Sequence, residues 1–334
     1  MLNYDGTVAY ELDPNDYSKK KDGTPSDIAD ASFNGNAMVG IPKIYYKIVD
    51  NGDDTANVYI SDKKVDNDYH CWSHLDNNGN EIPYCYMAIY EGKVNDNKVR
   101  SMSSGTTPQV STPFATVVNY MKNYDEIWNV GTFSDRTLIN LLLVLIGKST
   151  DTQTVFGNGN INSSALNVNG KLNDKGLFYG SSNTTSSVKV FGIENYWGNA
   201  RQPLVGYLVT DNKIKYKMTY DTSDGSTVKG YNTTGNGYME TTYFSTNGNN
   251  TYIKAMTFSP YGFFPKTGGG SSTTYYCDTY CGANNTLALV GGSYLNERYG
   301  GAFEICFYWS ISDQDYRYGV GALSCKPLAS TQNS

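Results

Sequence analysis

The sequence has few charged residues and no basic surplus. Asp, Glu, Lys and Arg make up 17% of its 334 residues, and 26 basic against 32 acidic residues leave a net charge of −6. Nucleic-acid binding requires Lys and Arg to neutralise phosphates, so we expect no nucleic-acid partner. Long apolar runs are also missing. The longest, residues 141–146, is far too short to span a bilayer, and we expect no membrane insertion.

Histidine is scarce, which limits the catalytic devices that the chain can build. The only two, His70 and His74, are followed by Asp76. Two imidazoles and a carboxylate mimic the facial triad that binds iron. However, an extended segment would hold the two rings roughly 13 Å apart, and Asp76 opens a turn-like sequence. A surface strand or loop is the favoured interpretation, with a metal site as the alternative.

Other catalytic and metal motifs are missing or incomplete. No Gly-x-Ser-x-Gly element occurs, and the 32 acidic residues do not single out a catalytic carboxylate pair. The Cys277-x3-Cys281 pair lacks the second pair of a zinc site. Asp221 and Asp224 fit no EF-hand spacing, so a turn is favoured there over a calcium site. We therefore expect no metal and no cofactor.

The first residues lack the basic and apolar regions of a secretory signal. We therefore expect cytoplasmic synthesis and reduced thiols. This expectation concerns six cysteines: Cys71, Cys85, Cys277, Cys281, Cys306 and Cys325.

Tyrosine and turn-forming residues are abundant instead. The chain has 30 Tyr and 34 Gly, a composition typical of short strands joined by turns and loops. Residues 1–35 are polar and turn-rich and are predicted to be an attachment segment. Residues 38–49 predict the first strand, and Pro42 indicates an edge position. Residues 58–61 and 84–90 predict further strands.

Two helices are expected between these strands and the second half of the chain. The first begins near Thr112-Pro113, with Pro at the first helical position, and runs to about residue 124. The second has Ser134 as its N-cap, with Phe133 and Leu138 as a hydrophobic staple. Leucines recur at helical spacing up to Gly147, which is expected to end the helix. Short β segments in long loops follow, so the fold class is α+β.

The C-terminal segment, residues 291–321, combines a predicted strand with polar aromatic flanks. From Phe303 to Ser310, apolar residues alternate with Glu304, Cys306 and Tyr308, which predicts a strand with one apolar and one mixed face. Tyr, Arg, Asp, Asn and Glu crowd both flanks. Such side chains supply contact area and directional hydrogen bonds in binding surfaces. Two interpretations stay open: a ligand-binding surface, or a solvated strand with Tyr-rich edges.

The order of several motifs resembles a known family. The Gly-Gly-Ser, Gly-Gly-Ala-Phe, Ile-Ser and Gly-Val-Gly-Ala-Leu frame within 291–323 resembles the C-terminal variable segment of C-type lectin-fold proteins. These include the targets of diversity-generating retroelements and the tail-tip adhesins of phages and prophages. Phe191-Gly-Ile-Glu-Asn-Tyr-Trp-Gly-Asn199 is similar to a signature shared with the formylglycine-generating-enzyme branch of that fold. Residues 38–47 are similar to the opening strand of gut-phage members, and the resemblance covers about residues 36–326.

The resemblance implies an expanded C-type lectin fold with short antiparallel strands, two helices and long loops. An attachment segment, 1–35, would precede a lectin-like domain, 36–330, with 291–321 as its ligand-display segment. The implied ligand contacts are Tyr294, Asn296, Glu297, Arg298, Tyr299, Glu304, Tyr308, Asp313, Asp315, Tyr316, Arg317 and Tyr318. The implied structural residues are Gly291, Gly292, Phe303, Ile305, Phe307, Gly319 and Gly321, together with Trp197 and Asn199.

The sequence departs from the family in several places. Ala200-Arg201-Gln202-Pro203 replaces the usual Trp-Glu-Trp continuation, and Gly321-Ala322 stands where an Arg is usual. The chain has no Glu-Pro-Asn, Gln-Pro-Asp or Trp-Asn-Asp motif for calcium-dependent sugar binding. Of the catalytic cysteines of the formylglycine branch, only Cys306 and Cys325 are candidates, and their spacing is long.

By this resemblance we expect a non-enzymatic receptor-binding protein of a phage or prophage tail, assembled in the host cytoplasm and located in the virion tail. Its partners would be other tail proteins and a bacterial surface protein or glycan, and a homo-oligomer, such as a trimer, would raise its avidity. Two alternatives stay open. One is an oxidase or metal enzyme of the same fold, and the other is a purely structural tail component.

Overall fold

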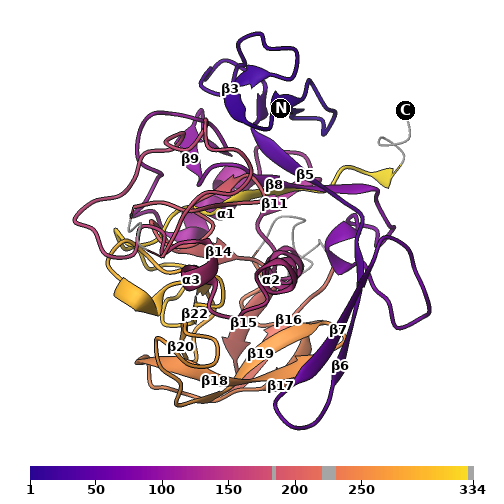
Figure 1. The fold of residues 1–334 in the computed structure, drawn as a ribbon, viewed down its shortest axis with the longest axis vertical. Coiled ribbons are helices and arrows are strands. Elements are labelled where there is room, and N and C mark those ends of the chain that lie inside the picture. The colour runs from indigo at the N-terminus through magenta and orange to yellow at the C-terminus, as the bar shows by residue number, and fades with distance from the viewer. Residues whose placement is uncertain (183–185, 220–230, 330–334) are drawn as a thin grey trace.

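The computed structural model of the protein describes residues 1–182, 186–219 and 231–329 (Figure 1). Over these residues short strands dominate, which confirms the α+β class. The helices in this part of the chain are α1 (Phe114–Met121), α2 (Phe133–Gly147) and α3 (Thr152–Phe156), with 3-10 turns η1 (Trp72–His74) and η2 (Glu297–Tyr299). Within the described ranges, no helix has the length and apolar character needed to cross a membrane.

A four-stranded antiparallel sheet lies on one side of α2. Its order is β11 (Trp128–Val130), β23 (Leu323–Cys325), β8 (Tyr84–Ala88) and β5 (Met38–Pro42). The predicted edge position near Pro42 is confirmed, since β5 is an edge strand. The predicted single strand 38–49 is wrong: β5 ends at Pro42, and Tyr45–Asp50 (β6) pairs instead with Ala56–Ser61 (β7). Proline has no N–H to continue the ladder.

A six-stranded sheet lies on the other side of α2. Its order is β14 (Gln202–Leu204), β21 (Ala288–Val290), β22 (Ile305–Cys306), β20 (Thr279–Cys281), β18 (Asn250–Ser259) and β19 (Gly262–Gly268). β22, which belongs to the C-terminal segment, lies between β21 and β20. It pairs antiparallel with β21 and parallel with β20. The C-terminal segment is thereby held in the middle of this sheet.

The other strands form smaller sheets. β15 (Tyr207–Thr210), β16 (Lys213–Tyr216) and β17 (Met239–Thr242) make a three-stranded sheet. The two-stranded pairs are β1 (Leu2–Asn3) with β4 (Gly35–Asn36), β2 (Leu12–Asp13) with β3 (Asp16–Lys20), β9 (Lys93–Asn95) with β10 (Lys98–Arg100), and β12 (Lys189–Val190) with β13 (Ile193–Glu194).

The N-terminal segment 1–35 has its own small sheets and packs against the body. In Figure 1 it projects at one end of the molecule. The Arg100 guanidinium donates hydrogen bonds to the carbonyls of Ala31, Phe33 and Gly35. Tyr17 is buried in a cluster with Ile89 of the body. The role of the segment in attachment stays a prediction.

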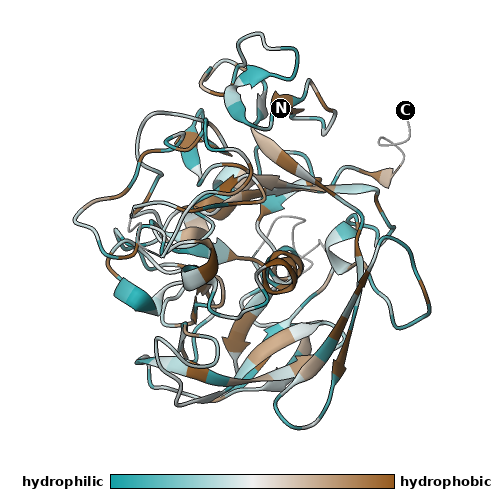
Figure 2. Ribbon diagram, viewed as in Figure 1, coloured by the Kyte–Doolittle hydropathy of each residue, from teal (hydrophilic) through white to brown (hydrophobic). Residues whose placement is uncertain are grey.

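Helix α2 is the centre of the main core. It lies between the two large sheets, and Figure 2 shows it as strongly hydrophobic. The predicted N-cap, Ser134, is wrong. Thr132 caps the helix instead, because its hydroxyl accepts from the Asp135 N–H while the Asp135 carboxylate accepts from the Thr132 N–H. Phe133 is therefore helical and not a staple residue, and its ring packs against Tyr207 and Phe264.

The other helix boundaries differ slightly from the predictions. α2 ends at Gly147 as expected, although the left-handed residue is Lys148, with φ of 51°. α1 is shorter than predicted, and Pro113 precedes it as the N-cap. The Ala115 N–H in its first turn donates to the carbonyl of Ile311 at 2.9 Å. α1 thus supports the C-terminal segment directly.

Candidate ligand-binding surface

The display segment 291–321 is mostly irregular backbone, and its centre is buried. β22 spans only Ile305–Cys306, and every residue from 301 to 307 is buried. The predicted strand 303–310 with a solvent-facing mixed face is therefore wrong. Side chains on both faces are buried: Phe307 packs against Tyr207, and Glu304 pairs with Arg201. The structural assignment of Phe303, Ile305 and Phe307 to the core is confirmed.

Glu304 is an interior ion-pair partner, which corrects its prediction as a ligand contact. Its Oε1 lies 3.0 Å from Nε of Arg201, and its Oε2 accepts from the Gly292 N–H at 2.8 Å. Burial raises the pKa of Glu304 above its ordinary value, while the charge of Arg201 opposes that rise. A buried carboxylate held by two donors fixes the start of the display segment to the strand that follows it.

Gly291 and Gly292 make the turn that leads into the display segment. Their φ angles are 89° and 75°, which L side chains rarely adopt. A Cβ on Gly292 would lie 2.5 Å from Cα of Gly300. Gly321 has a φ of 98°, which confirms its predicted structural role. At Gly319 a Cβ would make only ordinary van der Waals contacts, so steric crowding does not require glycine there.

Asn296 and Tyr318 are two further predicted ligand contacts that are buried. The Oδ1 of Asn296 accepts from the N–H and the hydroxyl of Ser293, at 2.8 and 2.5 Å. The ring of Tyr318 lies 5.8 Å from that of Trp309, centroid to centroid, and only 2% of Tyr318 is exposed. Both residues shape the segment from inside, so their assignment as exposed contacts is corrected.

A continuous group of aromatic and charged side chains lies outside this buried frame. We call it the display surface, made of Tyr294, Tyr308, Trp309, Asp315, Tyr316 and Arg317. Tyr308 and Tyr316 are exposed, and Tyr294, Trp309 and Arg317 are half-buried. The Tyr308 and Trp309 rings are in edge contact at 5.0 Å, and the Arg317 guanidinium lies 5.5 Å from the Trp309 ring.

Arg317 is held in place by Asp315. Nε and NH2 of Arg317 donate to the two carboxylate oxygens of Asp315 at 2.7 and 2.8 Å. Burial alone would raise the pKa of Asp315, but the hydrogen bonds and charge of Arg317 outweigh it and hold that pKa below its ordinary value. Burial and the proximity of Tyr316 and Asp315 raise the pKa of Tyr294. The guanidinium plane is therefore pre-oriented among aromatic rings.

The remaining predicted contacts lie outside this group. Arg298 contacts Asp151, Asn158 and the carbonyl of Ser272, at 3.5, 3.2 and 3.2 Å. Tyr299 packs edge-on against Tyr252 with 5.6 Å between centroids. Arg298 and Tyr299 thus share a second patch with residues distant in sequence.

Two other predicted contacts lie in the loops of the display segment. Glu297 is exposed and has φ of 50°. Asp313 stabilises a turn, since its carboxylate accepts from the Ser310 N–H and hydroxyl at 2.7 and 2.9 Å.

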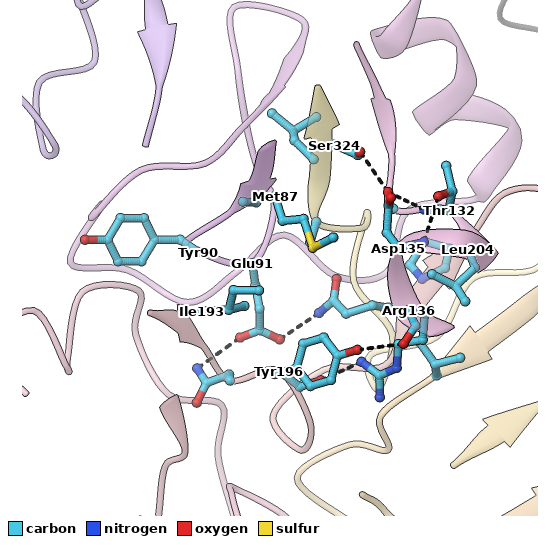
Figure 3. A pocket seen from close by; sticks show the side chains of 18 of the residues that line it. Met87, Tyr90, Glu91, Thr132, Asp135, Arg136, Ile193, Tyr196, Leu204 and Ser324 are labelled. Atoms are coloured by element: carbon cyan, nitrogen blue, oxygen red, sulfur yellow. Dashed lines mark hydrogen bonds between the residues drawn. The ribbon is translucent and has the colours of Figure 1, made fainter. Parts of the chain in front are cut away.

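A buried polar network supports the display surface from the body. The Glu91 carboxylate accepts from the Ala200 N–H and from the side-chain amides of Gln202, Asn195 and Asn199. Burial raises the pKa of Glu91 to about 8, and these donors oppose that rise. Figure 3 shows Glu91 and, nearby, the Tyr196 ring beside Arg136.

Trp197 and Asn199 have the structural roles implied for them. Trp197 is fully buried and donates its indole N–H to the carbonyl of Gly157 at 3.1 Å. Oδ1 of Asn199 accepts from Asn160 Nδ2 and from the Asn167 N–H, at 2.9 and 2.7 Å. The Asn199 carbonyl in turn accepts from the Tyr294 N–H at 2.8 Å. The 191–199 element therefore positions the first residue of the display surface.

A cavity of about 70 Å³ lies between the four-stranded sheet and the first turn of α2 (Figure 3). Arg136, Asn195 and Gln202 line it, and each has a buried polar atom without a hydrogen-bond partner within the described part of the chain: Nε, Oδ1 and Oε1. Ordered water is suited to satisfy such groups. The cavity is too small for a typical organic substrate.

The residues considered as metal ligands do not converge. His74 is buried, with Nε2 3.1 Å from the Ile41 carbonyl, and His70 stacks on Trp72. The surface location predicted for this segment therefore holds only in part. Over residues 1–182, 186–219 and 231–329, no group of three or more His, Cys, Asp or Glu is arranged to hold a metal ion. Asp221 and Asp224 lie outside the described residues.

Sequence reasoning missed several members of these surfaces. The alternation from Phe303 to Ser310 assigns Trp309 to the apolar face of the predicted strand, yet the Trp309 ring lies beside the Arg317 guanidinium. Tyr252, Asp151 and Asn158 come from segments far from the display segment, and no local pattern marks them.

Comparison with known proteins adds no assignment, since the chain matches no protein-family model and no curated protein.

Proposed function

We propose that the protein is a receptor-binding protein of a phage or prophage tail, with an expanded C-type lectin-like fold and no catalytic role. The observation that carries this proposal is the contrast within residues 291–321. The centre of the segment is fixed by buried polar pairs, while Tyr294, Tyr308, Tyr316 and Arg317 lie outside it. A rigid base with outward aromatic and guanidinium groups is the arrangement of a binding site.

The chemistry of the display surface suits a bacterial surface protein or glycan. Tyr and Trp offer large contact area with little loss of conformational entropy, and a clamped Arg offers directed hydrogen bonds. Oligomerisation, for example as a trimer, would convert weak single-site binding into avidity. In this proposal the N-terminal segment 1–35, at the far end of the chain, contacts other tail proteins in the virion.

The test compares three purified proteins for binding to a panel of whole bacterial cells. They are the wild type, the display variant Tyr294→Ala/Tyr316→Ala/Arg317→Ala, and the control Tyr59→Ala/Tyr84→Ala. The control removes two tyrosines of similar exposure, 46% and 45%, from β7 and β8. Melting temperature reports folding.

The proposal predicts that the wild type and the control bind the same cells, and that the display variant loses at least tenfold in affinity without losing stability. Equal binding by all three proteins contradicts the site. If no cell is bound and the display surface is protected within an oligomer, the structural-component alternative replaces the proposal.

A further inference from the structure

Two cysteines face each other where the display segment joins the six-stranded sheet. β20 and β22 pair in parallel, and their last residues, Cys281 and Cys306, are directly opposite. Opposed residues on neighbouring strands project to the same face, with strands roughly 4.8 Å apart. That spacing falls within the Cα separations that a disulfide spans. Both side chains are buried as free thiols, and Cys281 Sγ lies 3.1 Å from the carbonyl oxygen of Gly248, to which it donates a hydrogen bond.

The surroundings of the two thiols are unequal. Burial alone would raise the pKa of Cys306, but interaction with the neighbouring Cys281 thiol and the positive charge of Arg201 hold it below its ordinary value. The interaction with Cys306, together with burial, raises the pKa of Cys281. In the folded chain Cys306 therefore has the greater thiolate character. Both thiols are buried there, so oxidised glutathione reaches them only while the chain is open, when either sulfur can attack first.

We propose that Cys281 and Cys306 are a modification site that a small-molecule disulfide, such as oxidised glutathione, converts to an intramolecular disulfide. As the chain folds, one of the two thiolates attacks one glutathione sulfur, forms a mixed disulfide and releases one glutathione. The other cysteine then attacks the protein sulfur of that mixed disulfide and releases the second glutathione. Two electrons pass from the cysteines to the oxidant, and the two protein protons leave on the two glutathione thiols.

The bond would close the loop 282–305, which holds η2 and Tyr294. Cross-linking restricts the unfolded chain, so oxidation stabilises the fold. The proposal does not depend on the function proposed above. It concerns the anchoring of residues 291–305 to the body, whatever those residues bind.

Cys85 and Cys325 provide an internal comparison. They lie on the neighbouring strands β8 and β23, but Cys325 is opposite Tyr86 and not opposite Cys85. Side chains one position out of register project to opposite faces of a sheet. These two cysteines are therefore not expected to be bridged under the conditions that oxidise Cys281 and Cys306.

The experiment refolds the full chain in glutathione buffers from fully reduced to fully oxidised, because Cys281 and Cys306 are buried in the native state. Free thiols are then alkylated, and the protein is digested and analysed by mass spectrometry. We expect the six free thiols to fall to four. A peptide linking residues 281 and 306 should appear, and the melting temperature should rise by roughly 5 °C.

Three variants complete the test. Cys281→Ser and Cys306→Ser should each keep all five remaining thiols and show no rise in melting temperature. Cys85→Ser/Cys325→Ser should still lose two thiols. Six free thiols in the oxidised buffer, a stable glutathione adduct without the cross-link, or a cross-link between other cysteines would each overturn the proposal. The wild-type measurement alone decides the matter if a serine variant fails to fold.

Discussion

Arg201 and Glu304 form an ion pair with 3.0 Å between Nε and Oε1, and their side chains are only 6% and 0% exposed. Arg201 follows the 191–199 element, whereas Glu304 lies in the display segment. The pair therefore joins two parts of the chain that are about a hundred residues apart in sequence. Each charge is tolerated in the interior because the other is present.

Removing one member of this pair should cost far more than removing both. Arg201→Met leaves the Glu304 carboxylate buried without a counter-ion, and we expect a loss of about 3–5 kcal/mol in the free energy of unfolding. Arg201→Met/Glu304→Leu should recover most of that loss. Urea denaturation measures the wild type and both variants, and a double variant that is no more stable than Arg201→Met would contradict the pairing.

Gly292→Ala should destabilise the protein through both backbone strain and a steric clash. The φ angle is 75°, and the new Cβ would lie 2.5 Å from Cα of Gly300. Gly23→Ala is the matched control, because its φ is 86° but its Cβ would meet nothing within 4 Å. We expect about 1–2 kcal/mol for the control and a clearly larger loss for Gly292→Ala. Similar losses in thermal or urea unfolding would refute the close approach of Gly292 to Gly300.

The N-cap of α2 can be tested with two neighbouring substitutions. Thr132→Ala removes the hydroxyl that accepts from the Asp135 N–H, so we expect a loss of about 1 kcal/mol in the free energy of unfolding. Ser134→Ala removes a hydroxyl whose hydrogen bond, among the described residues, is to Thr132 Oγ1 at 3.0 Å, and it should cost less. If urea denaturation shows a larger loss for Ser134→Ala than for Thr132→Ala, Ser134 is the N-cap, as the sequence predicted.

Glu194 gives the protein a pH dependence with a defined sign. Burial raises its pKa to about 7, while hydrogen bonds from the Leu172 and Gly170 N–H groups oppose the rise. Between the unfolded pKa near 4.5 and the folded pKa near 7, the folded state holds the extra proton. Stability from this group is thus complete below pH 4.5 and is lost as the pH rises through 7.

The variant Glu194→Gln isolates that contribution, because it cannot ionise. The unfolding free energy of the wild type minus that of the variant should fall by roughly 2–3 kcal/mol from pH 4.5 to pH 8. Titrating groups that do not interact with Glu194, such as His74, are common to both proteins and cancel in this difference. Lys189 and Glu91, whose pKa values of about 8 depend in part on the Glu194 charge, do not cancel fully above pH 7. A difference that is constant or grows with pH would show that Glu194 is ionised throughout.

Local patterns predicted the parts of the fold that local physics controls. Leucines at helical spacing located α2, whose end at Gly147 was also correct, and Pro42 indicated an edge strand. These features depend on a few neighbouring residues, so a single sequence carries them. The family resemblance, and not a local pattern, implied structural roles for Gly291 and Gly292, whose positive φ angles agree with that role.

Features that depend on distant contacts were not predictable. The alternation from Phe303 to Ser310 indicated one solvent-facing side, but residues 301–307 are all buried, and β20 and β21 pair with the two edges of β22. Nothing near Glu304 in the sequence indicates that it is buried, because its ion-pair partner, Arg201, is distant in the sequence. Tyr252 joins Tyr299 from another strand, with no local motif to indicate that contact. Each of these cases depends on contacts between residues that are far apart in the sequence.

The central claim is that the display surface contacts a bacterial receptor, and residue-level protection tests it most directly. The protein is bound to cells that retain it, exposed briefly to hydroxyl radicals, recovered and compared with free protein by mass spectrometry. We predict that labelling of Tyr294, Tyr308 and Tyr316 falls at least threefold on binding, whereas that of Tyr59, on β7, is unchanged. Equal labelling of the three display tyrosines in free and bound protein would contradict the account.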